Sequence, residues 1–146
     1  MKKNILVSAC LLGKSCRYDG KSKPCPRVIA LGDTYNLIPI CPEVMGGLPT
    51  PRTPSEICGA RVLMKDGKDV TENYNRGAHE ALDIARKNAC TVAIFKEKSP
   101  SCGSGLIHNG QFDGGLIEGD GVTTQLLKKE GIRVFGESEV TEDFAL

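Results

Sequence analysis

Short apolar runs separated by glycine and proline dominate the hydrophobic pattern of this chain. Four such runs are largely apolar and rich in β-branched residues, at residues 4–7, 37–40, 91–95 and 132–135. Runs of this length without a regular polar alternation are typical of strands that are buried on both faces of a sheet. The pattern therefore predicts a central, mostly parallel sheet.

Two further segments have the spacing of amphipathic helices. In residues 71–88 the apolar side chains recur every three or four positions, and Thr71 is expected to be the N-cap. Residues 122–130 resume a helical pattern, which Gly131 ends. A helix followed by a strand favours βαβ crossover connections. We therefore predict an α/β fold in a single domain spanning residues 1–146, a mostly parallel sheet flanked by helices in a Rossmann-like three-layer arrangement.

The segments between these elements indicate loops and small hairpins. Residues 46–54 are too rich in Gly and Pro for a helix or a central strand, so they predict a rigid, shaped loop. The Asp-Gly pair in residues 65–68 predicts a turn between a strand at residues 60–64 and a return strand beginning at Val70. A second hairpin is expected around the Asn-Gly pair within residues 106–112.

Length and charge narrow the classes of function. The chain has 146 residues and a formal net charge of +1, which gives no electrostatic case for binding nucleic acid or a membrane surface. No apolar run is long enough to span a membrane, and the short strand behind Lys2 and Lys3 does not resemble a signal peptide. We therefore expect a cytoplasmic protein that binds neither membranes nor nucleic acid. The sequence leaves the oligomeric state open.

Cysteine is unusually frequent in the chain. The seven cysteines are an odd number without a secretory signal, which favours reduced thiols with metal or redox chemistry over a disulfide framework. Cys10, Cys41 and Cys102 each follow the end of an expected strand. Open α/β sheets bind their ligands at the carboxyl ends of the strands. We therefore expect these three thiols to converge on a metal or cluster site.

Two kinds of thiolate site fit this pattern. A structural zinc site needs four ligands and usually contains a Cys-x₂₋₄-Cys pair, which the chain lacks. A [4Fe-4S] cluster with only three cysteines keeps one iron open, which then acts as a Lewis acid. Cys16 is a fourth ligand, a persulfide carrier or a bystander, whereas Cys58 and Cys90 are expected to be small buried hydrophobes. His79 and His108 are not expected to be ligands.

Four motifs, taken in order, resemble one known family. They are SACLLG at residues 8–13, CRYDG at 16–20, CPEVMGGLPTPR at 41–52 and SPSCG at 99–103. They resemble the family catalogued as domain of unknown function 523 (DUF523), whose characterised members are similar to thiouracil desulfidases (TudS). The resemblance extends over nearly the whole chain, from the first strand to Gly131.

The resemblance implies an enzyme that breaks C–S bonds, as a hydrolase or lyase, with a [4Fe-4S] cluster as cofactor. Cys10, Cys41 and Cys102 would hold the cluster, with Cys16 as the alternative ligand and the fourth iron open. The implied substrate is a small thiolated base such as thiouracil, or another thioamide. Its sulfur would bind the open iron, water would attack the carbon, and sulfide would leave without a net redox change.

The same motifs contain candidate catalytic and substrate-binding residues. Glu43 follows Cys41 by two residues and would accept the proton of the attacking water, although a carboxylate here can also cap a turn. Ser101 would hydrogen-bond the substrate or relay a proton. Lys98 is a candidate substrate-binding residue because a cation suits a thiolate-rich site. Arg52 would contact a base edge or form a salt bridge with Glu56.

Two other classes of function are compatible with the cysteines. One is a zinc or iron–sulfur binding or carrier protein without turnover. The other is a thiol-redox protein that uses Cys16 with Cys10. A brown, oxygen-sensitive protein that releases sulfide from thiouracil would distinguish the desulfidase from both.

Overall fold

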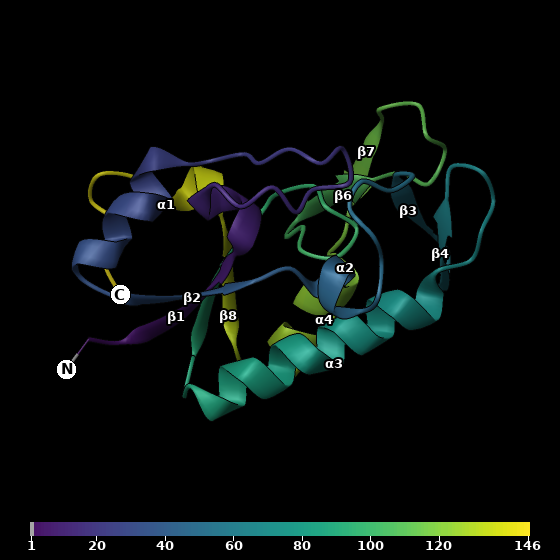
Figure 1. Ribbon diagram of the computed structural model, residues 1–146. Helices are drawn as coiled ribbons and strands as arrows, with labels where there is room; N and C mark the ends of the chain where they lie inside the picture. Colours follow the sequence, from purple (N-terminus) through teal and green to yellow (C-terminus); the bar gives the residue numbers. More distant parts are fainter. Residues whose placement is uncertain (1) are drawn as a thin grey trace.

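A four-stranded parallel sheet forms the centre of the molecule in a computed structural model that describes residues 2–146 (Figure 1). The strand order is β2-β1-β5-β8, with β1 at Asn4–Ser8, β2 at Asn36–Ile40, β5 at Val92–Phe95 and β8 at Arg133–Gly136. Each pair of neighbouring strands in this sheet is parallel. The predicted α/β fold with a mostly parallel sheet is therefore confirmed.

The two central strands, β1 and β5, are buried on both faces. Successive side chains of a strand point to opposite faces of the sheet. In β1, Ile5 and Val7 pack into the apolar cluster on one face and Leu6 into the cluster on the other. The side chains of β5 divide between the same two clusters. This two-sided burial is the physical reason why both strands are nearly continuous apolar runs in the sequence.

Helices cover both faces of the sheet. α3 (Thr71–Lys87) and α4 (Val122–Lys129) pack on one face, while α1 (Pro26–Ala30) and the C-terminal segment pack on the other (Figure 1). The apolar side of α3 faces the sheet, as its helical spacing predicts. The flanking helices therefore confirm the layered arrangement.

Two small antiparallel hairpins lie beyond the carboxyl ends of the sheet strands (Figure 1). One pairs β3 (Ser55–Cys58) with β4 (Arg61–Met64), and the other pairs β6 (Leu106–His108) with β7 (Leu116–Glu118). The hairpin expected at the Asn-Gly pair is therefore present. Its return strand begins later than predicted, because residues 109–115 form a longer tip loop.

The predicted return strand at Val70 is wrong. β4 pairs with β3, which precedes it in the chain, and an isolated bridge joins Leu63 to Asp69. Val70 is the N-cap of α3, so Thr71, which was expected there, is the first helical residue. The Thr71 hydroxyl instead accepts a hydrogen bond from the Val62 N–H at 2.9 Å, which ties the start of the helix to β4.

A short helix that the sequence analysis did not predict, α2 (Pro42–Met45), follows β2. Proline suits its first turn because the fixed φ of proline is already helical. α2 packs so closely on α3 that a side chain at Gly77 would overlap the Pro42 carbonyl oxygen. A side chain at Gly46 would likewise overlap the Asn73 carbonyl oxygen. These contacts fix both ends of α2 against the long helix.

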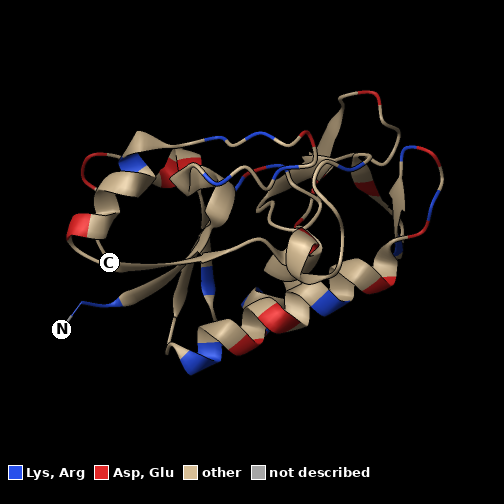
Figure 2. Cartoon of the chain, viewed as in Figure 1, with Lys and Arg blue, Asp and Glu red and all other residues tan. Residues whose placement is uncertain are grey.

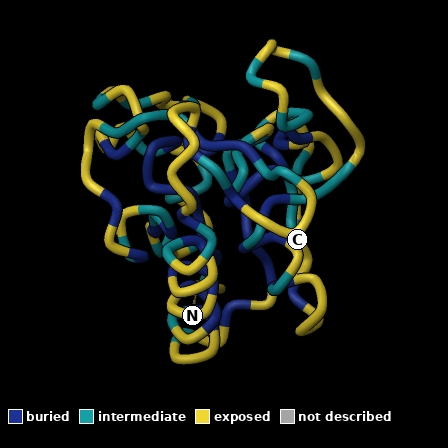
Figure 3. Tube along the Cα trace, turned by 90° about the vertical axis from the view of Figure 1, so that its right-hand side faces the viewer, coloured by how far each residue is buried: buried dark blue, intermediate teal, exposed yellow. Residues whose placement is uncertain are grey.

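Charged residues of both signs alternate along α3 and the surface loops (Figure 2). Buried stretches run through the middle of the molecule, and exposed ones lie on the outer helical faces and projecting loops (Figure 3). Within residues 2–146 no helix is both long enough and apolar enough to cross a membrane.

Gly77→Ala tests the contact between α2 and α3. Alanine normally stabilises a helix by about 1 kcal/mol relative to glycine. Here the added methyl group collides with the Pro42 carbonyl. We therefore expect the free energy of unfolding, measured by urea titration, to fall by about 2 kcal/mol. Asn75→Ala, at an exposed position of the same helix, is the control and should not lower it. A Gly77→Ala protein at least as stable as wild type would contradict this packing.

Candidate functional site

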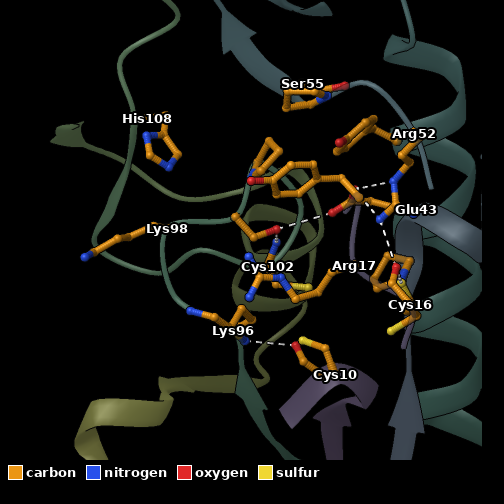
Figure 4. Close-up of a pocket in the computed structure, with 18 of the residues that line it drawn as sticks. Cys10, Cys16, Arg17, Glu43, Arg52, Ser55, Lys96, Lys98, Cys102 and His108 are labelled. Atoms are coloured by element: carbon orange, nitrogen blue, oxygen red, sulfur yellow. Dashed lines mark hydrogen bonds and ion pairs between the residues drawn. The ribbon is translucent and has the colours of Figure 1, made fainter. Parts of the chain in front are cut away.

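A cavity of about 310 Å³ opens at the carboxyl ends of β1, β2 and β5 (Figure 4). Cys10, Cys41 and Cys102, which follow these three strands, all line it. Cys16 joins them from the loop after β1. The structure thus brings together the three strand-end thiols and the alternative ligand.

The segment after β1 folds back across the end of the strand. Cys10 lies in the short 3₁₀ helix Ala9–Leu12, and its carbonyl oxygen accepts backbone N–H groups from Gly13 and Lys23 at 3.2 and 3.0 Å. Gly13 adopts a φ of 97°, which a side chain would disfavour, and so reverses the chain. The returning loop carries Cys16 to the same edge, where Cys10 and Cys16 are 7% and 6% exposed.

Cys41 lies at the junction of β2 and α2. Its backbone is extended, and its thiol donates a hydrogen bond to the Cys16 carbonyl oxygen at 3.7 Å. The helix that starts at Pro42 places Glu43 in the lining of the same cavity. The packing of α2 on α3 therefore positions a thiol and a carboxylate together.

Cys102 is held in a turn between β5 and α4. The Ser99 hydroxyl accepts the backbone N–H groups of Ser101 and Cys102, both at 3.1 Å. The first backbone N–H groups of α4 donate to carbonyls of this turn, and the Thr124 hydroxyl donates to the Cys102 carbonyl oxygen at 2.9 Å. Cys102 is consequently fixed in place and only 5% exposed.

The surroundings of Cys16, Cys41 and Cys102 raise the pKa of each thiol and favour its neutral form. The pKa of Cys16 is raised chiefly by a hydrogen bond with Cys10, and that of Cys41 by a hydrogen bond with Cys16 and by burial. Burial raises the pKa of Cys102 to about 12. Coordination reverses this preference, because a thiol that binds a metal loses its proton. The thiols would therefore ionise when a metal binds.

Glu43 and Arg52 form the most buried ion pair among the described residues. Arg52 Nη2 and Nε donate to Glu43 Oε2 at 2.9 and 3.1 Å, and the arginine side chain is only 3% exposed. Its other N–H groups donate to the Cys16 carbonyl, the Pro49 carbonyl and the Thr50 hydroxyl at 3.1, 3.2 and 3.2 Å. All five N–H donors of the guanidinium therefore have partners. Arg52 pairs with Glu43 rather than with Glu56.

The two serines beside Pro100 have different surroundings. Ser99 lines the cavity, and its hydroxyl donates to Glu43 Oε1 at 3.4 Å. Ser101 is fully buried, and its hydroxyl pairs with that of Thr123 at 2.8 Å. Among the described residues that line the cavity, Ser99 is present and Ser101 is not. The sequence motif contains both hydroxyls, and its spacing does not show which one faces the cavity.

Several basic side chains also line the cavity. Lys98, a predicted substrate-binding residue, lines it, although its amino group points away from the cysteines (Figure 4). Lys96 also lines it and forms an ion pair with Glu137 at 2.9 Å. Cys90, expected to be a small buried hydrophobe, lies in the core beneath the sheet and not in the cavity.

Several residues of the cavity were missed by the sequence analysis. They come from α3 and the two hairpins and include Ser55, Tyr74 and Phe112. Glu56 was expected only as a partner of Arg52 and His108 was not expected to be a ligand, and both also line the cavity. Burial, with a further contribution from Glu43, raises the pKa of Tyr74. Tyr74 has the spacing of a core residue, and the hairpin residues belong to none of the recognised motifs, so no sequence signal distinguishes them.

Comparison with known proteins shows the family to which the chain belongs. A family model described as 2-thiouracil desulfurase matches residues 5–139. The chain belongs to this family. The resemblance carried by the four cysteine- and glycine-containing motifs is therefore confirmed.

Two known proteins are closely similar to the chain. A solved structure, described as the [4Fe-4S]-dependent thiouracil desulfidase TudS (DUF523), is 48% identical with a TM-score of 0.90, over 94% of this chain and 93% of that one. The uncharacterised protein YbbK of Bacillus subtilis (strain 168) is 43% identical over 148 residues, or 94% of this chain and 98% of YbbK. The fold of the whole desulfidase is thus shared.

Arg52→Met tests the ion pair at the cavity wall. The change leaves the Glu43 carboxylate largely buried without its partner, so we expect the free energy of unfolding to fall by about 3 kcal/mol in denaturant titrations at neutral pH. Arg52→Lys should lose less, because it keeps the charge but not the paired geometry. The double change Arg52→Met and Glu43→Gln should recover part of the loss.

The exposed pair of Arg61 with Asp69 supplies the control for this measurement. Arg61→Met removes an ion pair of similar type at the surface, where solvent screens it, so its effect should be much smaller. If Arg52→Met and Arg61→Met lowered the free energy of unfolding equally, the buried pair of Glu43 with Arg52 would not support the loop of residues 46–54.

Proposed function

We propose that this protein is a [4Fe-4S]-dependent desulfidase that releases sulfide from a thiolated nucleobase such as thiouracil by non-redox hydrolysis. The observation that carries the proposal is the meeting of four thiols with the Glu43 carboxylate in a single cavity at the strand ends. The membership of the chain in the 2-thiouracil desulfurase family and its likeness to TudS support the same reaction class.

The donor set of the cavity fits an iron–sulfur cluster. Its candidate ligands are all thiols from separate segments, and thiolates are the ligands that such clusters prefer. Within residues 2–146 no three His, Cys, Asp or Glu side chains are arranged to share one metal ion. A cluster binds each thiolate through a different iron, so its ligands need not meet at one point. Cys10, Cys41 and Cys102 would hold it, with Cys16 as the alternative.

The chemistry that a bound cluster supplies is an open iron that attracts the thiocarbonyl sulfur and polarises the C–S bond. The protein contributes the proton transfers. Glu43 accepts a proton from a water molecule as that water attacks the carbon bonded to sulfur. The new C–O bond replaces the C–S bond, so that water and a thiocarbonyl become a carbonyl and hydrogen sulfide, with no change of oxidation state.

The contacts of Glu43 suit this role. Arg52 holds one carboxylate oxygen, Oε2, through two hydrogen bonds, and the other oxygen, Oε1, lies near Ser99. We therefore assign Arg52, predicted to bind substrate, to the positioning of Glu43, because its donors are all engaged. Oε1 is the oxygen that would receive the proton.

Ser101 and Lys98 have secondary roles in this proposal. The Ser101 hydroxyl is buried against that of Thr123, so Ser101 would act on the reaction through the turn that carries Cys102. Lys98 would attract the substrate at the mouth of the cavity and favour its binding as an anion.

Anaerobic reconstitution with iron and sulfide tests the function. The reconstituted protein should show cluster absorption and release sulfide and uracil from thiouracil in equal amounts. Cys10→Ser, Cys41→Ser and Cys102→Ser should abolish the cluster spectrum. Cys58→Ser, outside the cavity, should retain it, because serine can still donate to the Gly110 carbonyl that Cys58 contacts. A cluster-loaded protein that releases no sulfide from any thiolated base would refute the proposal.

Glu43→Gln tests the assigned base. The amide cannot accept the proton of water, so kcat should fall by about 10²- to 10⁴-fold while the cluster spectrum is unchanged. Glu118→Gln, an exposed change on β7, is the matched control and should keep wild-type kcat. Normal turnover by Glu43→Gln would show that another group accepts the proton.

A further inference from the structure

The β6–β7 hairpin closes one end of the cavity. Two of its residues, His108 and Phe112, line the cavity, and His108 lies at the end of the cavity away from Cys10 and Cys16 (Figure 4). Phe112 is only partly exposed, yet it belongs to none of the three apolar clusters formed by the described residues. Its ring therefore lines the cavity and does not pack into the core of the protein.

The backbone holds Phe112 in an unusual conformation. Its φ is 54°, in the left-handed region that residues other than glycine seldom occupy. Such a conformation persists only where the surrounding structure fixes it, and it occurs preferentially at ligand-binding positions. The contacts that fix it are therefore informative about function.

A buried carboxylate supplies these contacts. Glu56, in β3, is 7% exposed, and its Oε1 accepts the backbone N–H groups of Gly110 and Phe112 at 2.8 and 3.2 Å. Burying a carboxylate is costly unless it is hydrogen-bonded. The two hydrogen bonds that Glu56 Oε1 accepts hold the tip loop of the hairpin over the cavity.

Side chains within the tip loop stabilise it further. Asn109 accepts the Gln111 N–H at 2.9 Å, Asp113 accepts the Gly115 N–H at 2.8 Å, and the two side chains hydrogen-bond each other at 3.0 Å. The loop is thus ordered before any ligand binds, which lowers the entropic cost of binding.

The neighbouring His108 also marks this hairpin as an element that faces a ligand. Its Nδ1 is buried and is the one such side-chain atom without a hydrogen-bond partner among the described residues. Buried polar atoms in native proteins are nearly always paired. An unpaired nitrogen on a ring that lines the cavity is therefore unexpected for a purely structural hairpin.

We propose that residues 109–115 are the specificity element for the substrate ring, with Glu56 holding Phe112 as an apolar wall against the face of a flat heterocycle. This inference rests on the proposed function and adds how the ring of the thiolated pyrimidine is recognised. Aromatic side chains stack on nucleobases through their π faces. The substrate would lie with its sulfur toward the thiols and its ring against Phe112.

Phe112→Ala tests the wall. We expect KM for thiouracil and the inhibition constant of uracil to rise about tenfold with kcat nearly unchanged, because stacking is lost without touching the reacting atoms. Phe112→Tyr should remain within about twofold of wild type. Leu116→Ala, an exposed apolar change on the same hairpin, is the matched control and should change neither constant. A Phe112→Ala protein that behaves like Leu116→Ala would overturn the proposal.

Glu56 is tested by hydrogen exchange of residues 109–115 in the reconstituted protein. Glu56→Ala should speed this exchange and raise KM as Phe112→Ala does, whereas Glu56→Gln, whose amide oxygen can accept the same N–H groups, should stay near wild type. Uracil should slow the exchange in wild type but not in Phe112→Ala. If the wild-type protein releases no sulfide, the proposed function fails. The slowing of hydrogen exchange by uracil then tests by itself whether Phe112 forms a wall for the ring. Absence of that protection in wild type would overturn it.

Discussion

The parallel pairing of β1 with β2 and β5 is the constraint on which the site depends. In this register Ser8 lies beside Ile40, so Cys10 and Cys41 emerge beyond the same rung of the sheet. β5 flanks β1 on its other side and brings the turn of Cys102 to the same edge. Burial of the two central strands on both faces maintains the register, since a slip of one residue would exchange their inward and outward side chains.

A continuous polar network joins the segments that this edge brings together. It runs from the Cys102 N–H to the Ser99 hydroxyl, from there to Glu43, and through Arg52 to the Cys16 carbonyl. A network of this kind in a low-dielectric site is strongly stabilising when every member is satisfied. The Glu43 carboxylate, which we propose as the base, is therefore part of the framework that positions two of the thiols. Its position depends on the packing of α2 against α3 as much as on its neighbours in sequence.

The cavity has two chemically different ends. The thiol end presents four cysteine thiols and the Glu43 carboxylate, whereas the hairpin end presents the aromatic ring of Phe112 on a loop anchored by Glu56. A thiolated pyrimidine has the matching polarity, with a soft sulfur atom at one edge and a flat ring behind it. This correspondence links the family membership of the chain to features of its own structure.

Local patterns determined the main elements of this protein by themselves. The buried strands, the amphipathic α3 and the strand-end positions of Cys10, Cys41 and Cys102 were all predictable, because period and strand-end geometry depend on neighbouring residues. Tertiary structure alone decided the pairing of β3 with β4, the choice of Ser99 over Ser101 at the cavity, and the partner of Arg52. It also placed Glu56 beneath Phe112, residues far apart in the chain. These contacts arise from segments that meet only after folding, so no local spacing encodes them.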